Sequence, residues 1–245
     1  MDSNFYLIVT LIFISAGMVK GITGMGLPTV AMGLLGSMMP LSMAVSLLFI
    51  PALVTNLWQL GAGPALGRIL KRLGWMMLCM IFSTIICVQF LLQMNVVWAN
   101  FALGIALLIY AGYAFIAPKI SIARSIETGL SPCMGLITGM VTGMTGVFVM
   151  PAVPYLQSLD LSQDELLQAL GLSFTLSSLA LAFGLYCHDA WDVGALSDSI
   201  LAVIPALCGM WLGQKIRAKI SPKRFRQFFL FFLMCLGLEL ISAIF

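Results

Sequence analysis

Two glycine-rich segments contain the residues whose types and spacing could bind a ligand. The first runs from Gly17 to Pro28 and the second from Gly135 to Gly146, and each contains the tripeptide Thr-Gly-Met. Clustered glycines with a proline nearby weaken a helix and leave backbone N–H and C=O groups free. In an apolar surrounding such groups must line a cavity that the protein itself encloses. The pattern therefore favours a broken helix in each segment.

The free groups in these segments suit a negatively charged ligand. The N-terminus of a half-helix presents N–H groups and the positive end of the helix dipole, so it can hold an anion without a fixed cation. Threonine hydroxyls at the same level add donors, and Lys20, which lies outside every Lys/Arg cluster, could neutralise an anion. The predicted substrate-binding residues are Lys20, Thr23, Gly24, Met25, Gly26, Asn56, Thr142, Gly143, Met144, Thr145 and Gly146.

Each of these candidates also has a purely structural interpretation. Glycines at GxxxG spacing can serve close helix packing, and an asparagine such as Asn56 can join two helices. The threonines can bond to their own helices, and Lys20 can extend its ammonium group to the membrane surface. Aligning the two segments places Thr138 at the position of Lys20, so the second has no matching cation. Recurrence in both halves of the chain favours a substrate site.

The composition indicates that these segments belong to a membrane protein and lie among its membrane spans. Of the 245 residues, 61% are hydrophobic and 9% are charged, and the mean hydropathy is +1.09. Soluble domains carry about 25% charged residues. Soluble enzymes, nucleic-acid binders and disordered scaffolds are therefore excluded. The net charge of +3 comes from short Lys/Arg clusters between apolar runs, which is typical of loop anchoring rather than of nucleic-acid binding.

The apolar runs divide the chain into spans of membrane length. Their predicted bounds are 5–39, 41–62, 74–93, 96–117, 131–159, 163–186, 193–214 and 223–245. Ser131-Pro132 and Ser221-Pro222 each place a capping hydroxyl before a proline, which predicts helix starts there. Ser162 and Glu165 form the pattern of a capping box.

The Lys/Arg clusters predict how the spans are oriented. If the clusters at 68–72, 119–124 and 215–226 all face the cytoplasm, then 131–159 enters and leaves on one side, and 5–39 does the same. The termini then face outward and the two halves are inverted. We predict an all-α polytopic membrane protein with inverted repeats whose broken or re-entrant Gly-rich helices meet near the membrane midplane. Its parts are an N-terminal repeat 1–117, a cytoplasmic linker 118–130 and a C-terminal repeat 131–245.

The sequence does not point to catalytic, metal or cofactor chemistry. The six cysteines show no CxxC spacing, and the 17 methionines show no ligand spacing. His188, flanked by aspartates, is typical of a solvated loop. No Walker motif occurs. We expect no catalytic residue, no metal and no cofactor. Two other classes stay open, a membrane enzyme that handles sulfur through Cys133 and a non-transporting assembly subunit.

The paired Gly-rich segments, each opening a four-segment half, resemble the TauE/SafE family over nearly the whole chain. Pro151 fits the proline that follows the family's glycine motif, and Met25 interrupts the first motif. The family comprises sulfite and organosulfonate exporters and is grouped with toluene-sulfonate uptake permeases. The resemblance implies a secondary permease in the cell membrane for a small anion such as sulfite, a sulfonate or a related organic anion. The expected partners are that anionic substrate and the lipid bilayer, with a homodimer as an option and no nucleic acid.

Overall fold

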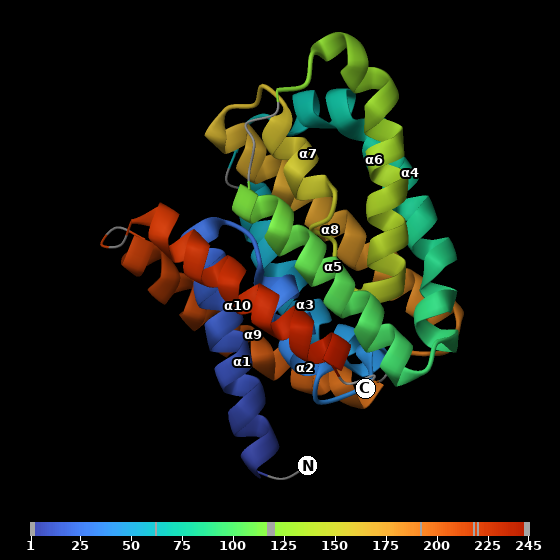
Figure 1. Cartoon of the computed structure of the whole chain (residues 1–245), viewed down its shortest axis with the longest axis vertical. Helices are drawn as coiled ribbons and strands as arrows, with labels where there is room; N and C mark the ends of the chain where they lie inside the picture. Colours follow the sequence, from blue (N-terminus) through green and yellow to red (C-terminus); the bar gives the residue numbers. More distant parts are fainter. Residues whose placement is uncertain are drawn as a thin grey trace.

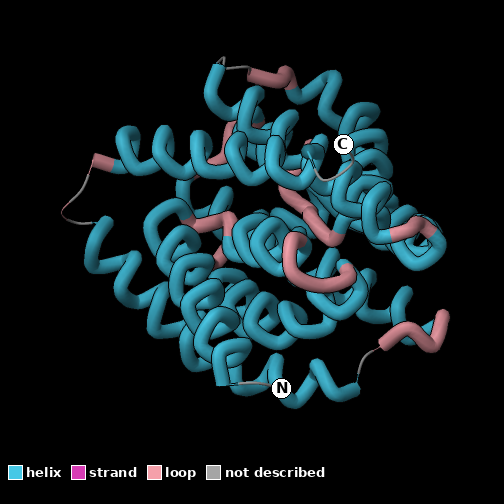
Figure 2. Tube along the Cα trace, turned by 60° about the horizontal axis from the view of Figure 1, so that its bottom comes forward, coloured by secondary structure: helices cyan, strands magenta, loops and turns pink. Residues whose placement is uncertain are grey.

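The computed structural model describes residues 3–61, 63–116, 121–191, 193–217, 219 and 221–242, and these residues form helices joined by short loops (Figure 2). The helices are α1 (Ser3–Thr23), α2 (Leu27–Gly36), α3 (Leu41–Gly61), α4 (Leu66–Gln93), α5 (Val96–Ile116), α6 (Arg124–Thr145), α7 (Ala152–Ser158), α8 (Gln163–Cys187), α9 (Val193–Arg217) and α10 (Pro222–Ser242). Seven of those described, α1, α3, α4, α5, α8, α9 and α10, are long and apolar enough to cross a membrane. The prediction of an all-α polytopic membrane protein is confirmed.

Two of the three predicted helix starts are confirmed. At α8, Ser162 Oγ accepts from Glu165 N at 3.2 Å while Glu165 Oε2 accepts from Ser162 N at 3.1 Å, which completes the capping box. Helix α10 begins at Pro222, as its Ser-Pro pair predicts.

The predicted start at Ser131-Pro132 is wrong, because α6 already begins at Arg124 and continues through Pro132. The Ser131 hydroxyl is bonded to Tyr155 at 2.6 Å and caps no helix. The two preceding turns stay helical because Glu127 on them is buried against Arg72 of α4. Part of the predicted linker 118–130 therefore belongs to a helix.

Helix α4 likewise begins earlier than predicted, at Leu66 rather than near residue 74. The basic residues 68–72 therefore lie on a helix and not in a loop. Lysine and arginine are good helix formers, and their long side chains leave the helix backbone unstrained. The first turns of α4 thus carry charged groups to a fixed place beside α6 and α8.

The helices of the first half (α1–α5) pack against those of the second half (α6–α10) in a symmetric pattern. Helix α1 packs along α9 and α6 along α4, while α3 packs against α8 and α5 against α10. Figure 1 shows α4 and α6 side by side on one flank and α1 with α9 on the other, with both marked chain ends at the same end of the molecule. A two-fold relation between the halves produces such a pattern. Their inversion across a bilayer, the re-entrant path and the boundaries of the repeats stay predictions.

Glycines permit the two closest of these helix contacts. A Cβ added at Gly17 or Gly21 of α1 would lie 2.2 Å from a carbonyl oxygen of α9. A Cβ at Gly135 or Gly139 of α6 would lie 2.1 or 2.3 Å from a carbonyl oxygen of α4. The backbones therefore touch directly, as small-xxx-small packing requires. For these four glycines the packing interpretation is confirmed.

We expect Gly17→Ala to lower the free energy of unfolding by about 1–3 kcal/mol, because its methyl group would overlap the carbonyl of Ala206 and force α1 from α9. Gly112→Ala on α5 is the matched control, since a Cβ there meets nothing within 4 Å. Thermal unfolding of the two purified variants measures the difference. Equal melting temperatures would contradict this close packing.

The first glycine-rich segment breaks where the sequence predicts. Helix α1 ends at Thr23 and α2 begins at Leu27, with Gly24 at φ 79° and Gly26 at φ 99°. Such positive φ values favour glycine because a side chain would crowd the backbone. The break at Gly24–Gly26 is therefore confirmed.

The second break lies at Gly146, whose φ is 71°, at the end of the predicted Gly135–Gly146 segment. Gly143 and Met144 are helical. Gly143 serves packing instead, because a Cβ there would lie 2.7 Å from the Cβ of Cys87 on α4. Glycine spacing alone does not distinguish a glycine needed for φ from one needed for space.

The two helix ends share one hydrogen-bond pattern, which corrects the alignment of the segments. Gly24 N donates to Lys20 O at 2.7 Å, and Gly146 N donates to Thr142 O at 2.8 Å. The threonine before each of these glycines also bonds the backbone four residues earlier and accepts from the N–H two residues later. Lys20 thus corresponds to Thr142 and not to Thr138.

Candidate functional site

A cavity of about 970 Å³ adjoins the first helix break. Its walls come from the α1–α2 connection, from α5, α7 and α10, and from the adjoining ends of α6 and α9. Ligand pockets of small molecules commonly measure about 300–1,000 Å³. The cavity therefore has the size of a solute site and is bordered by elements from both halves of the chain.

Three arginines give this cavity a positive character. Arg124, Arg217 and Arg226 line it, and Asp160 is the one carboxylate among its described lining residues. The ion pairs found in the described part of the chain involve other arginines, so these three guanidinium groups have no carboxylate partner there. Arg226 is held in place because its Nη2 donates to Ala114 O at 2.8 Å. A cavity bordered by an excess of positive charge attracts anions.

The residues of the first break form the inner part of the cavity. Thr23 and Met25 line it together with Tyr110 and Phe229. The Thr23 hydroxyl donates to Met25 O at 2.6 Å, and the buried Tyr110 hydroxyl lies 3.6 Å from Met25 Sδ. These contacts fix the loop between α1 and α2 against α5. The break thus contributes both polar and apolar groups to the lining of the cavity.

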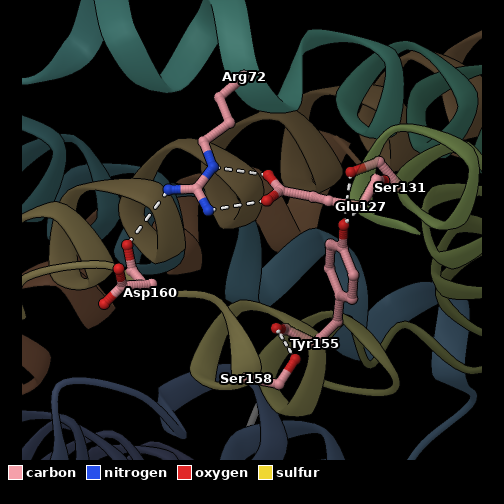
Figure 3. Close-up of polar contacts among 6 residues, drawn as sticks. All are labelled: Arg72, Glu127, Ser131, Tyr155, Ser158 and Asp160. Carbon is pink, nitrogen blue, oxygen red and sulfur yellow. Dashed lines mark hydrogen bonds and ion pairs between the residues drawn. The ribbon is translucent and has the colours of Figure 1, made fainter. Parts of the chain in front are cut away.

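A buried ion pair supports one wall of the cavity (Figure 3). Arg72 Nε and Nη2 on α4 donate to the two carboxylate oxygens of Glu127 on α6, at 2.6 and 2.8 Å. Arg72 Nη1 also donates to Asp160 O at 3.3 Å, just after α7. On the same side, Tyr155 of α7 is bonded to Ser131 of α6 at 2.6 Å. The network ties α4, α6 and α7 together, so it fixes the segment that carries Asp160.

The structure brings Lys20 and Asn56 together, away from the surface. Lys20 is 3% exposed, and its Nζ donates to Thr55 Oγ1 at 3.1 Å and to Asn56 Oδ1. The interpretation in which Lys20 reaches the membrane surface is therefore wrong. Asn56 does join α3 to α1 through this bond. Neither residue is among those that line the cavity.

The predicted residues of the second segment do not line the cavity. The hydroxyls of Thr142 and Thr145 each donate, at 2.7 Å, to the carbonyl four residues earlier in α6. The small space beside Gly146 measures about 10 Å³, which is close to the minimum for one water molecule. Gly24 N and Gly146 N, at the end of the helix before each break, already have backbone partners. Binding of an anion by backbone N–H groups at the two helix breaks stays a prediction.

Sequence reasoning assigned the cavity arginines to loop anchoring alone. Arg124, Arg217 and Arg226 belong to the basic clusters, and nothing local in the sequence separates them from neighbouring lysines. One signal was available, because all three are arginines, whose planar fork suits oxyanions better than the ammonium group of lysine. Tyr110, Tyr113 and Gln157 add polar groups to the cavity and carry no sequence signal.

The fold and the site together define a polytopic helical membrane protein with a positively charged, solute-sized cavity. Comparison with protein families gives a match to the family described as sulfite exporter TauE/SafE over residues 9–240, and the chain belongs to this family of membrane transporters. The resemblance carried by the glycine segments is thereby confirmed. Comparison with curated proteins and with solved structures found no match.

Proposed function

We propose that this transporter moves a small oxyanion, sulfite, a sulfonate or a related organic anion, across the cytoplasmic membrane. The observation that carries the proposal is the cavity in which three arginines without carboxylate partners in the described chain meet the first helix break. The family described as sulfite exporter TauE/SafE supports the sulfur-oxyanion class.

The cavity offers donors that match a sulfite or sulfonate head group. Each guanidinium presents N–H groups in one plane and can bind two oxygens at once. The hydroxyls of Tyr110 and Tyr113 and the amide of Gln157 lie on the same lining. We assign the anion to Arg124, Arg217 and Arg226, with Thr23 and Met25 shaping the inner end. This shifts the main donors from the backbone N–H groups to arginine side chains.

The membrane-enzyme alternative has less support. Cys133 is exposed on α6, and no hydrogen bond joins it to an acid or base in the described chain. A nucleophilic cysteine needs such a neighbour to form its thiolate. We therefore propose transport without catalysis, and the Cys133→Ala variant should transport as the original chain does.

Thermal unfolding of the purified protein with a panel of anions tests the proposal. Sulfite, small alkyl sulfonates, sulfate and carboxylates are each added at the same ionic strength, with chloride as the control. An anion present at 100 times its dissociation constant should stabilise the fold by about 2.7 kcal/mol. We expect sulfite or a sulfonate to raise the melting temperature most. Equal melting temperatures across the panel would count against the proposed substrate class.

A further inference from the structure

A buried polar cluster lies at the contact between α1 and α3, one helical turn before the first break. Lys20 Nζ donates to Thr55 Oγ1 at 3.1 Å and to Asn56 Oδ1, and both partners are fully buried. Two more side-chain atoms there, Asn56 Nδ2 and Gln59 Oε1, are buried without a hydrogen-bond partner among the described residues. We refer to Lys20, Thr55, Asn56 and Gln59 as the Lys20 cluster.

The cluster contains an amine but no carboxylate. Helix α2, which packs against α1, and helix α3, which the Lys20 side chain reaches, carry no titratable side chain. On the other helices packed against α1, the described titratable residues are Asp198, Cys208, Lys215 and Arg217 of α9 and Arg224, Arg226, Cys235 and Glu239 of α10. No hydrogen bond or ion pair joins any of these to Lys20. A buried ammonium group without a counter-ion is costly, because it has left water and gained only neutral partners.

The hydrogen bonds of the cluster fit both protonation states of the amine. Thr55 donates its own hydroxyl proton to Pro51 O at 2.8 Å, so toward Lys20 its oxygen acts as an acceptor. A neutral amine has two N–H donors, and Thr55 and Asn56 supply two acceptors. An ammonium group has a third N–H, and the unused acceptor on the same face of α3 is Gln59 Oε1, whose amide Nε2 donates to Leu167 O of α8 at 3.0 Å. Only the net positive charge then lacks compensation.

An anion in the arginine-lined cavity would supply that compensation. Thr23, which lines the cavity, follows Lys20 by three residues, and the Lys20 carbonyl accepts from Gly24 N at 2.7 Å. The amine is thus attached to the same helix end that borders the anion. Opposite charges attract strongly where water is excluded. The bound anion therefore lowers the free-energy cost of a buried Lys20 ammonium group, and the ammonium group lowers the cost of burying the anion.

We propose that Lys20 carries the proton that accompanies each transported anion. As the anion enters, the Nζ lone pair takes a proton from a hydronium ion, so that an O–H bond breaks, an N–H bond forms and a water molecule is left. As the anion leaves on the other side, that N–H bond breaks and the proton passes to water, which becomes hydronium. No electron transfer is involved, and one positive charge crosses with each anion. The inference rests on the proposed function, and it adds the coupling ion to it.

Proteoliposomes loaded with a pH-sensitive dye test this coupling. The probe is a radiolabelled small alkyl sulfonate, which stays an anion throughout the working range, so it cannot carry the proton itself. Sulfonate entry and lumenal pH are measured together for the original chain, for Lys20→Met and for Lys20→Arg. Methionine keeps the length of the side chain without a proton site, and arginine keeps the charge permanently.

For the original chain we expect about one proton to enter with each sulfonate. For both variants we expect slower sulfonate exchange that moves no protons. Sulfonate transport without protons in the original chain, or proton movement that persists in Lys20→Met, would overturn the assignment of Lys20 while leaving anion transport intact. Absence of sulfonate binding and exchange in the original chain would instead refute the proposed function, and the coupling with it. The ratio in the original chain tests the coupling even if one variant fails to fold, and the other variant then tests the assignment to Lys20.

Discussion

Arg226→Gln is expected to weaken binding of the best sulfur oxyanion by about 10- to 100-fold, since a hydrogen bond to a charged group contributes about 1.5–3 kcal/mol. Arg226 lines the cavity and is held by Ala114 O at 2.8 Å, so its guanidinium is already positioned before the anion arrives. The Lys variant should keep the attraction but lose the paired donors, and it should bind with intermediate affinity. Titration of the purified protein with the anion measures both constants.

Arg224→Gln is the matched control for this prediction. Arg224 is an arginine on the same helix and is exposed like Arg226, but it does not line the cavity. Its replacement removes the same charge from α10, and only the long-range attraction should change, by less than about threefold at physiological salt. If both variants lose affinity equally, the cavity arginines attract the anion only through long-range electrostatics and do not bind it directly.

Arg72→Gln is expected to lower the free energy of unfolding by about 3–5 kcal/mol, because it leaves the buried Glu127 carboxylate without its partner. It also removes the bond to Asp160 O, so α7 loses one of its attachments to α4. Chemical or thermal unfolding in detergent measures the loss. The double variant Arg72→Met with Glu127→Leu should recover most of it, since no unpaired charge is left buried.

Arg68→Gln provides the control on the same helix. Arg68 pairs with Glu165 at 2.9 Å, but the Arg68 side chain is 76% exposed. Exposed pairs contribute about 0–1 kcal/mol because water screens them. A loss at Arg72 no larger than the loss at Arg68 would show that burial of Glu127 adds nothing to this pair.

The sequence was most informative where a structural rule is local. The positive φ values at Gly24 and Gly26, the capping box at Ser162 and the start at Pro222 each depend on residues a few positions apart. The start near Ser131 failed for the opposite reason. Whether the preceding turns stay helical depends on Arg72, which is distant in the chain and adjacent in space.

Glycine spacing indicates where helices pack closely or break, but it does not distinguish between the two. Gly143 and Gly146 look alike in the sequence, yet one fills a contact with α4 and the other adopts a positive φ. The difference depends on which neighbour approaches, so the sequence pattern does not show which of the two glycines ends the helix. The hydrogen bonds at the two helix ends align Lys20 with Thr142 rather than with Thr138.

Composition and hydropathy by themselves determined that this chain is a polytopic helical membrane protein, since too few charged residues are present to cover a soluble surface. The glycine motifs determined the family and the first break. Only the tertiary structure decided that three arginines from two separate clusters share one cavity, and that Lys20 is enclosed with Thr55 and Asn56. Hydropathy and backbone preference are properties of neighbouring residues, whereas the convergence of charges depends on how distant helices pack.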